Sequence, residues 1–407
     1  MKKTVFALLA LAFCLSACAP AEAKTQETFN SIVENVQTPE TAAEQTSLPP
    51  VGNLTMNINA REDDTGYYST GVWENPETGE PRWVLYRLDY STGQQKILYD
   101  FGSYGSEDAA VFDPFVQKDA VYVEGKDSLY RLPLDGGEME ILPLDQNVGS
   151  GFSDENACYQ LASNLYTNAV QPTVRRVDLR TGAMTQWELP AMYIFAVYDC
   201  RGDRAFISRF VTSQPLPSTD EEELFHIVLQ NSVKEYDWLN LATGELEKVL
   251  EEPYAGETDE NGHTGYWNYL GMTEDSIYFR YNVIDGQGTQ LSGSIARCAL
   301  DGSGMETVMQ LDTSNTLYPV ERGGQLAWLL DYDYTGPATI YDLEQGKVYE
   351  NIPVQGNDSG WPAALTNDGR VLVNDHYDGA QPTYALINPD DYLAGSRNWV
   401  LFTEADN

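Results

Sequence analysis

The sequence predicts an all-β fold, a seven-bladed β-propeller of four-stranded antiparallel blades. An alternating apolar run ends at Asp or Asn, a Thr-Gly or Gly-Gly turn follows, and a second alternating run begins. Copies of this pattern centre on Gly93, Gly137, Gly182, Gly244, Gly304, Gly346 and Gly395. Repeats of about 40 to 50 residues built from short strands are typical of propeller blades. The composition agrees, because 26 Tyr and 33 Gly suit short strands joined by tight turns.

The N-terminus precedes these repeats and has the pattern of an export signal. A basic pair, Lys2-Lys3, is followed by an apolar run from Val5 to Leu15, which is too short to span a bilayer. The run ends in Leu15-Ser16-Ala17-Cys18, which resembles the lipobox of bacterial lipoproteins. The resemblance implies cleavage before Cys18 and a diacylglyceryl thioether on its sulfur. The alternative is an ordinary secretory signal.

This pattern defines the expected domains and the expected location. Residues 1–17 are predicted to be a lipoprotein signal peptide, and residues 18–53 a lipidated Cys followed by a flexible tether. Residues 54–407 are the expected propeller domain. Acyl chains anchor a protein without crossing the membrane, so we expect an extracytoplasmic protein held on the cell membrane by its lipid alone.

The strands are clearest in the second and fifth repeats. Blade two is expected to contain strands at 120–123, 129–132 and 139–142, and blade five at 267–272, 276–282 and 294–300, with an outer strand after Gly304. Two long repeats are explained by insertions at 212–232 and 251–265. In the last repeat, Asn388-Pro389-Asp390-Asp391 replaces the usual turn, so we expect residues 55–59 to pair with the last blade and close the ring.

A second repeating signal lies between the second and third strands of a blade. It reads Tyr166–Thr173 in blade three, Tyr332–Thr339 in blade six and Tyr377–Thr383 in blade seven. Because the two repeating signals occur in a constant order, residues 54–403 resemble the extracytoplasmic TolB-like and WD40-like propellers, in particular the propeller lipoproteins of Gram-positive bacteria. The Trp-Asp dipeptide that ends a WD40 blade is absent. The resemblance implies a binding platform more often than an enzyme.

The net charge narrows the classes of partner, and the number of cysteines bears on the presence of a disulfide. The formal net charge is −38, which disfavours binding to nucleic acid or to anionic lipid surfaces, since both require clustered Lys and Arg. Three Cys remain after the lipid site, at Cys158, Cys200 and Cys298. We interpret them as buried small hydrophobic residues, with a Cys158–Cys200 disulfide as the alternative.

No catalytic signature is present, so no catalytic residue is predicted. Gly-x-Ser-x-Gly, phosphate loops, His-Glu-x-x-His and Cys-x-x-Cys are absent, and Thr366-Asn367-Asp368-Gly369 has the wrong spacing for a sialidase Asp box. We interpret that segment as a turn between strands. The three His all lie in predicted loops. No cofactor and no metal are expected. Ca²⁺ is the one ion for which the sequence offers ligands, in the form of Asp oxygens and a fragment of a calcium loop at Asp259–Gly262.

The best functional candidate is one face of the propeller. Loops between second and third strands gather there with the loops that link successive blades. The predicted ligand-binding residues on this face are Tyr166, Trp267, Asp331, Tyr332, Asp333, Tyr334, Trp361, Asp375, His376, Tyr377 and Asp378. Tyr and Trp supply stiff contact area with a polar tip, and carboxylates accept hydrogen bonds.

The leading hypothesis is therefore a non-catalytic binding or scaffolding propeller that recognises a protein, a peptide or a glycan at the cell envelope. The alternative is a carbohydrate-active enzyme, a polysaccharide lyase or glycosidase, that uses carboxylates in the central cleft. A third hypothesis, a structural subunit of an envelope complex, predicts an exposed apolar patch on the outer edge of one blade.

Overall fold

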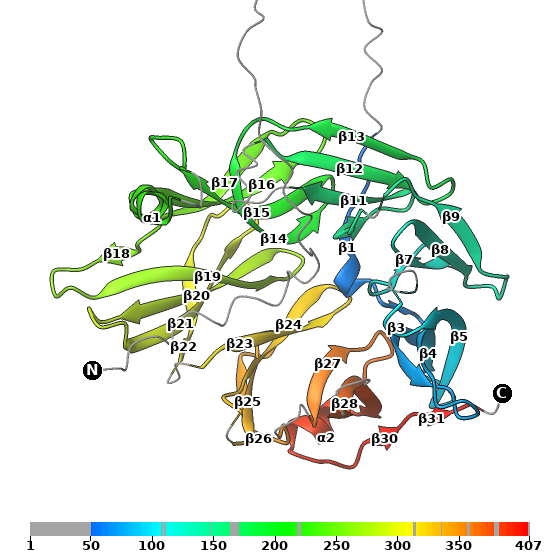
Figure 1. Ribbon diagram of the computed structural model, residues 1–407. Coiled ribbons are helices and arrows are strands. Elements are labelled where there is room, and N and C mark those ends of the chain that lie inside the picture. Colours follow the sequence, from blue (N-terminus) through cyan, green and yellow to red (C-terminus); the bar gives the residue numbers. More distant parts are fainter. Residues whose placement is uncertain are drawn as a thin grey trace, which may run out of the picture. The chain divides into compact units, whose positions relative to one another are not determined.

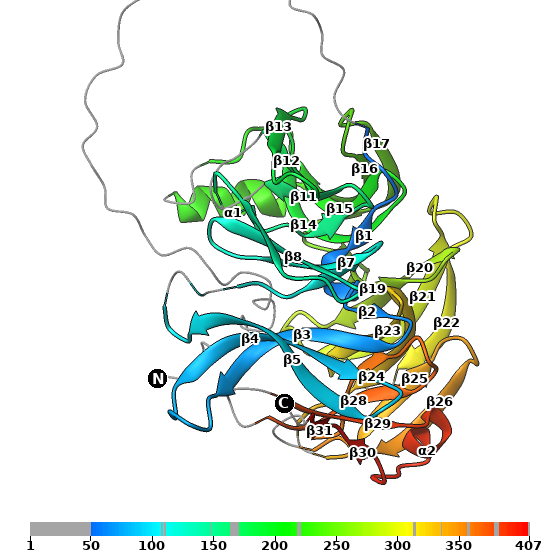
Figure 2. The ribbon, with the colours of Figure 1, turned by 90° about the vertical axis from the view of Figure 1, so that its right-hand side faces the viewer.

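The computed structural model confirms the predicted seven-bladed propeller. It describes residues 50–106, 109, 111–146, 148–162, 171–217, 221–311, 315–334, 336–355, 359–377 and 382–405. These residues form seven sheets, each with four consecutive antiparallel strands as its body, and three sheets carry one further strand. Figures 1 and 2 show the sheets in chain order, from blue to red.

Each blade uses four strands in chain order, from the innermost strand outwards. Blade one contains β2 (Glu62–Asp63), β3 (Gly66–Glu74), β4 (Pro81–Asp89) and β5 (Gln94–Ser103). Blade two contains β6 (Phe115–Gln117), β7 (Ala120–Glu124), β8 (Ser128–Pro133) and β9 (Glu140–Pro143). Blade three contains β10 (Phe152–Ser153), β11 (Ala157–Ala162), β12 (Thr173–Asp178) and β13 (Met184–Glu188). Blade four contains β14 (Tyr193–Arg201), β15 (Arg204–Val211), β16 (Val233–Asn240) and β17 (Leu246–Pro253).

The remaining blades follow the same order. Blade five contains β19 (Thr264–Met272), β20 (Ser276–Ile284), β21 (Gln290–Ala299) and β22 (Glu306–Leu311), with a short inner strand β18 (Glu257–Thr258). Blade six contains β23 (Leu317–Arg322), β24 (Gln325–Asp331), β25 (Ala338–Asp342) and β26 (Lys347–Ile352). Blade seven contains β27 (Trp361–Leu365), β28 (Val371–Tyr377), β29 (Pro382–Ile387) and β30 (Val400–Leu401). The insertion at 212–232 contains helix α1 (Glu222–Gln230), and the one at 251–265 contains β18.

The side chain of the Asp or Asn in the repeated turn holds that turn by accepting backbone hydrogen bonds. In blade one, the Asp89 carboxylate accepts hydrogen bonds from the backbone N–H groups of Ser91 and Thr92. Asp178 and Asn240 make the same pair of bonds in blades three and four. The glycine that follows has φ of 66°, 71° and 75° in these three turns, in the left-handed region that favours glycine. The sequence pattern is therefore the turn between the third and fourth strands.

Two copies of the turn depart from the pattern. In blade two the positive φ belongs to Gly136 and not to the expected Gly137. In blade seven a short helix, α2 (Pro389–Leu393), replaces the turn, with Pro389 in its first turn. Tyr392 of α2 is fully buried, stacks on Trp328 of blade six and donates a hydrogen bond to the carbonyl of Gly360. The helix therefore closes the space between the last two blades.

Packing between neighbouring blades buries many of the aromatic residues. Between blades four and five, Phe206, Tyr236, Trp238 and Phe279 belong to one buried cluster. The Trp238 indole N–H donates to the carbonyl of Leu300 across this interface. Each sheet covers the apolar face of the next, which is why a single blade cannot be stable alone.

The expected pairing of residues 55–59 with the last blade is wrong. Strand β1 (Thr55–Met56) pairs antiparallel with β10 of blade three, so that Thr55 lies opposite Ser153. It continues into a 3₁₀ turn, η1 (Asn57–Asn59). The Asn57 amide bonds to Ser150 and accepts from Ser153 at 2.7 Å, so a buried polar network fixes this segment to blade three. Backbone alternation alone did not specify which inner strand this short strand would join.

Residues 54–63 form a crossing segment that contacts the inner parts of several blades. The backbone N–H of Leu54 donates to the carbonyl of Gly202 in blade four. The backbone N–H groups of Val116 in blade two and of Tyr68 in blade one donate to carbonyls of this segment. The carboxylate of Glu62 accepts the backbone N–H of Asn367 in blade seven. The crossing segment therefore joins blades that are distant in sequence.

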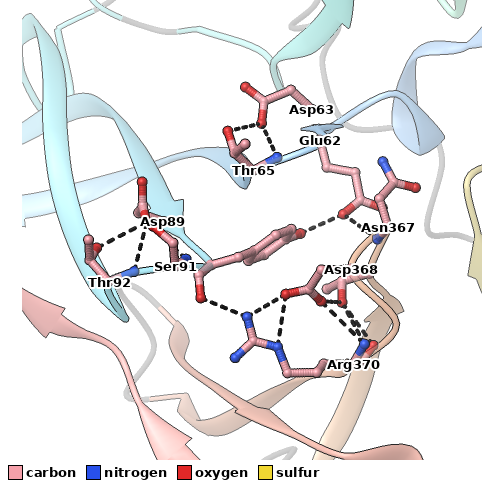
Figure 3. Close-up of polar contacts among 11 residues, drawn as sticks. Glu62, Asp63, Thr65, Asp89, Ser91, Thr92, Asn367, Asp368 and Arg370 are labelled. Carbon is pink, nitrogen blue, oxygen red and sulfur yellow. Dashed lines mark hydrogen bonds and ion pairs between the residues drawn. The ribbon is translucent and has the colours of Figure 1, made fainter.

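The first and last blades meet in a polar seam, shown in Figure 3. Arg370 donates to the carbonyl of Tyr90 at 2.7 Å and holds the carboxylate of Asp368. The Tyr90 hydroxyl donates to Glu62 at 2.5 Å. A final strand, β31 (Thr403–Glu404), pairs parallel with β5 of blade one. The Thr366–Gly369 segment forms the predicted turn, between β27 and β28, and provides the blade-seven side of this seam.

Cys158, Cys200 and Cys298 are free and buried, as the preferred interpretation expected. Burial raises the pKa of the Cys158 thiol to about 12 and that of Cys298 to about 11, so both stay protonated at neutral pH. Within the described part of the chain, no helix is long and apolar enough to span a bilayer.

Candidate functional site

Four aromatic residues from blades six and seven form one cluster, which we name the aromatic platform: Tyr318, Tyr332, Tyr334 and Trp361. Tyr318 lies in β23 and Trp361 begins β27, while Tyr332 and Tyr334 follow the end of β24. The ring centroids of Tyr318 and Trp361 are 4.9 Å apart, and those of Tyr332 and Tyr334 are 5.0 Å apart. Tyr332 also packs edge-on against Trp361 at 6.3 Å. Three of the predicted residues therefore come together, with Tyr318 added.

The platform has a buried base and an exposed top. Tyr332 is 3 % exposed, whereas Tyr334 is 58 % exposed. Tyr334 has φ of 65°, an unusual backbone conformation for a bulky residue, and its hydroxyl lies 3.1 Å from the hydroxyl of Tyr318. Strain of this kind at an exposed side chain is typical of functional loops. The arrangement presents a held, exposed ring with polar oxygens beside it, which suits stacking against a ligand.

Asp331 holds the loop beneath the platform and does not point into solvent. It is buried at the end of β24, accepts a hydrogen bond from the Asn315 amide at 2.8 Å and another from the Tyr341 hydroxyl at 3.2 Å. The Arg280 guanidinium also lies near this carboxylate, and burial lowers the Arg280 pKa. Asp331 is therefore a positioning residue, and the exposed Asp333 is the carboxylate that faces outwards.

Three of the blade-seven candidates, Asp375, His376 and Tyr377, lie at the end of a strand and not in a loop. Asp375 and His376 lie in β28, and the half-buried Asp375 accepts a 2.7 Å hydrogen bond from the Trp399 indole. His376 is exposed. Tyr377 ends β28, and its side chain lies outside the described residues, as do Tyr166 and Asp378. The prediction that all His lie in loops is wrong, because His226 lies in α1 as well.

Trp267 lies apart from the platform. It sits within β19 and packs on Phe279 and Tyr281 of β20 at 6.2 and 4.5 Å, in blade five. Its carbonyl accepts hydrogen bonds from Lys234 and Tyr236 of blade four. This residue therefore supports the interface between two blades, and it lies in the strand that the sequence predicts at 267–272.

A second group of interest, which is not among the predicted site residues, lies on the inner strands. We name Asp199 of β14 and Glu321 of β23 the inner carboxylate pair. The Tyr269 hydroxyl of β19 donates to Asp199 at 3.2 Å. Burial raises the pKa of Asp199 to about 6, and burial together with the charge of Asp199 raises the pKa of Glu321 to about 7. Acidic residues inside otherwise apolar inner strands were the only signal in the sequence.

The Asp259 carboxylate, one of the groups considered for calcium, binds backbone N–H groups of its own loop. Asp259 accepts the backbone N–H groups of Asn261 and His263, each at 2.8 Å, so it caps a turn between β18 and β19. Among the described residues, no cluster of three His, Cys, Asp or Glu side chains has the geometry to hold a metal ion.

Comparison with known proteins finds distant structural likenesses and no sequence relative. No family model and no curated protein matches the chain. An oligogalacturonate lyase in complex with manganese aligns over 81 % of this chain and 99 % of its own, at 12 % identity and a TM-score of 0.48. The β-propeller domain of the Trilobed protease from Pyrococcus furiosus aligns over 82 % and 93 %, at 8 % identity and a TM-score of 0.46. An acylaminoacyl peptidase aligns over 83 % of this chain and 51 % of its own, at 9 % identity and a TM-score of 0.46.

Proposed function

We propose that this protein is an extracytoplasmic binding propeller, tethered to the cell membrane through a lipid on Cys18, that holds a glycan, peptide or protein ligand on the aromatic platform. The observation that carries the proposal is the exposed Tyr334 ring, held by Tyr318 and supported from below by Tyr332. Aromatic rings fixed in place lose little entropy on binding and bury much area. No resident cofactor is required.

The test begins with arrays of polysaccharides and peptides probed with the folded domain, followed by titration of the ligands that bind. Tyr334→Ala should weaken binding by about 1 to 3 kcal/mol, since an exposed ring at the centre of a small site carries much of its affinity. The matched control is Tyr104→Ala, because Tyr104 is also exposed but lies after β5, in blade one. Equal loss in both variants would contradict the assignment to blades six and seven.

The inner carboxylate pair supports a second candidate, a carbohydrate-active enzyme. Two carboxyl groups with pKa values near neutrality can exchange protons at the pH of the cell surface. Cleavage of an array polysaccharide by the wild type, lost in both Asp199→Asn and Glu321→Gln, would establish this activity. Binding without cleavage would leave the binding propeller as the function.

The lipid anchor has its own test. Metabolic labelling with a fatty-acid analogue should mark the wild type in its native host and should leave Cys18→Ala unmarked. Labelling of both proteins, or of neither, would refute lipidation at Cys18.

A further inference from the structure

Helix α1 belongs to blade four but is not needed to complete it. It lies in the connection between β15 and β16, residues 212–232, whereas the same connection in blade five takes only residues 285–289. Figure 1 shows α1 beside the strands of blade four. Among the described connections between second and third strands, this one alone contains a helix. The insertion therefore adds a feature to the repeat.

The inner face of α1 is firmly attached to the blade. Phe225 and Leu229 are buried against Phe210 of β15, with Tyr193 and Leu216 packed beside them. The Ser232 hydroxyl donates to the carbonyl of Leu229 at 2.6 Å, which holds the end of the helix. Attachment of this kind fixes the direction in which the opposite face points.

The outer face of α1 is apolar at its centre. Leu224 is 48 % exposed and Ile227 is 49 % exposed, and residues three apart lie on the same face of a helix. Phe195 of β14 is 37 % exposed and packs at 5.3 Å on Phe210, the residue that α1 covers. We name Leu224, Ile227 and Phe195 the α1 surface.

Charge indicates which occupant this surface would accept. Glu221, the N-cap of α1, and Glu223 in its first turn are exposed, and the whole chain carries a net charge of −38. A second copy would bring the same charges to the same place. Three side chains are few for the roughly 800 Å² per partner that a stable protein dimer buries, so a single helix fits the size better.

We propose that the α1 surface docks a basic amphipathic helical segment of a partner protein. The apolar face of that helix covers Leu224 and Ile227, and its Lys or Arg side chains face Glu221 and Glu223. The surface lies at the end of blade four that carries its second-to-third-strand connection, not on the outer edge strand, and it is separate from the aromatic platform of blades six and seven.

The probe is a synthetic amphipathic helix of about 18 residues made of Leu and Lys, with a scrambled peptide of equal composition as the reference. Fluorescence anisotropy in physiological salt should show tighter binding of the helical peptide. Leu224→Gln with Ile227→Gln should weaken it about tenfold, and Glu221→Gln with Glu223→Gln should weaken it less. The control pair, Val308→Gln with Val348→Gln, changes equally apolar exposed positions on β22 and β26 and should bind as the wild type does.

Three results would overturn the proposal. The first is equal binding of the helical and scrambled peptides, and the second is unchanged binding by the Leu224 and Ile227 variant. The third comes from sedimentation: a concentration-dependent dimer that the same variant abolishes would assign the surface to a second copy. Tyr334→Ala should leave peptide binding unchanged, which separates this test from that of the proposed function.

Discussion

The inner carboxylate pair shows how single buried groups make the fold sensitive to pH. In the folded protein the pKa of Glu321 is raised to about 7 from its ordinary 4.5, because burial favours the neutral acid. The folded state therefore binds a proton that the unfolded state has already lost at intermediate pH. The resulting stability is complete below about pH 4.5 and is lost as the pH rises through about 7.

Glu321→Gln should remove most of this dependence. The variant should gain about 2 to 3 kcal/mol in unfolding free energy relative to wild type between pH 5 and pH 8, because it lacks a carboxyl group whose pKa folding raises from 4.5 to about 7. Urea unfolding at four pH values measures the difference. Glu344→Gln is the control, because that side chain is 76 % exposed. Parallel curves for wild type and Glu321→Gln would contradict the assignment.

At the scale of elements, the turns show what a sequence can predict. The Asp or Asn that caps the turn and the glycine with positive φ both leave a local signature, so the number of blades and most strand positions follow from residues close in sequence. The blade-five and blade-two strands agree with expectation to within a few residues. Helix α2 departs because Pro389 starts a helix where other blades place a turn.

Two turn glycines allow a matched test of backbone strain against steric clash. Gly244 has φ of 75° and a Cβ there would lie 2.2 Å from Pro190, whereas Gly346 has φ of 62° and a Cβ would meet no atom within 4 Å. Gly346→Ala should cost about 1 to 2 kcal/mol, the penalty of a left-handed residue. Gly244→Ala should cost about 1 to 3 kcal/mol more, because the Pro190 ring must shift.

Urea unfolding of the two variants measures this difference. Equal destabilisation would show that the Gly244 turn relaxes without strain and that the close approach to Pro190 has no energetic weight.

For the whole molecule, the order of blades in space could be predicted from the sequence, but ring closure could not. Residues 54–63 join blades separated by up to about three hundred positions, and such pairings leave no local pattern. The same reason explains the partial success with the candidate site. Tyr332, Tyr334 and Trp361 could be predicted as site residues because aromatic residues in expected loops are visible in the sequence. The role of Asp331 could not, because it depends on Asn315 and Tyr341, which only the fold brings near.

The crossing segment should therefore stabilise the ring as a whole. Asn57→Ala removes bonds to Ser150 and Ser153 and leaves these buried groups with fewer partners, so it should cost about 1 to 3 kcal/mol. Asn398→Ala, at an exposed position, should cost less than about 0.5 kcal/mol. A calorimetric scan of both variants compares them, and similar melting temperatures would argue against a closing role for this segment.

Hydrogen exchange with and without an array-selected ligand is the sharpest test of ligand binding on the aromatic platform. We expect slower exchange of the amides in 315–334 and 359–361 on binding, with no change in the opposite turns at 273–275. Protection confined to those turns, or to β14 and its partners in blade four, would contradict it.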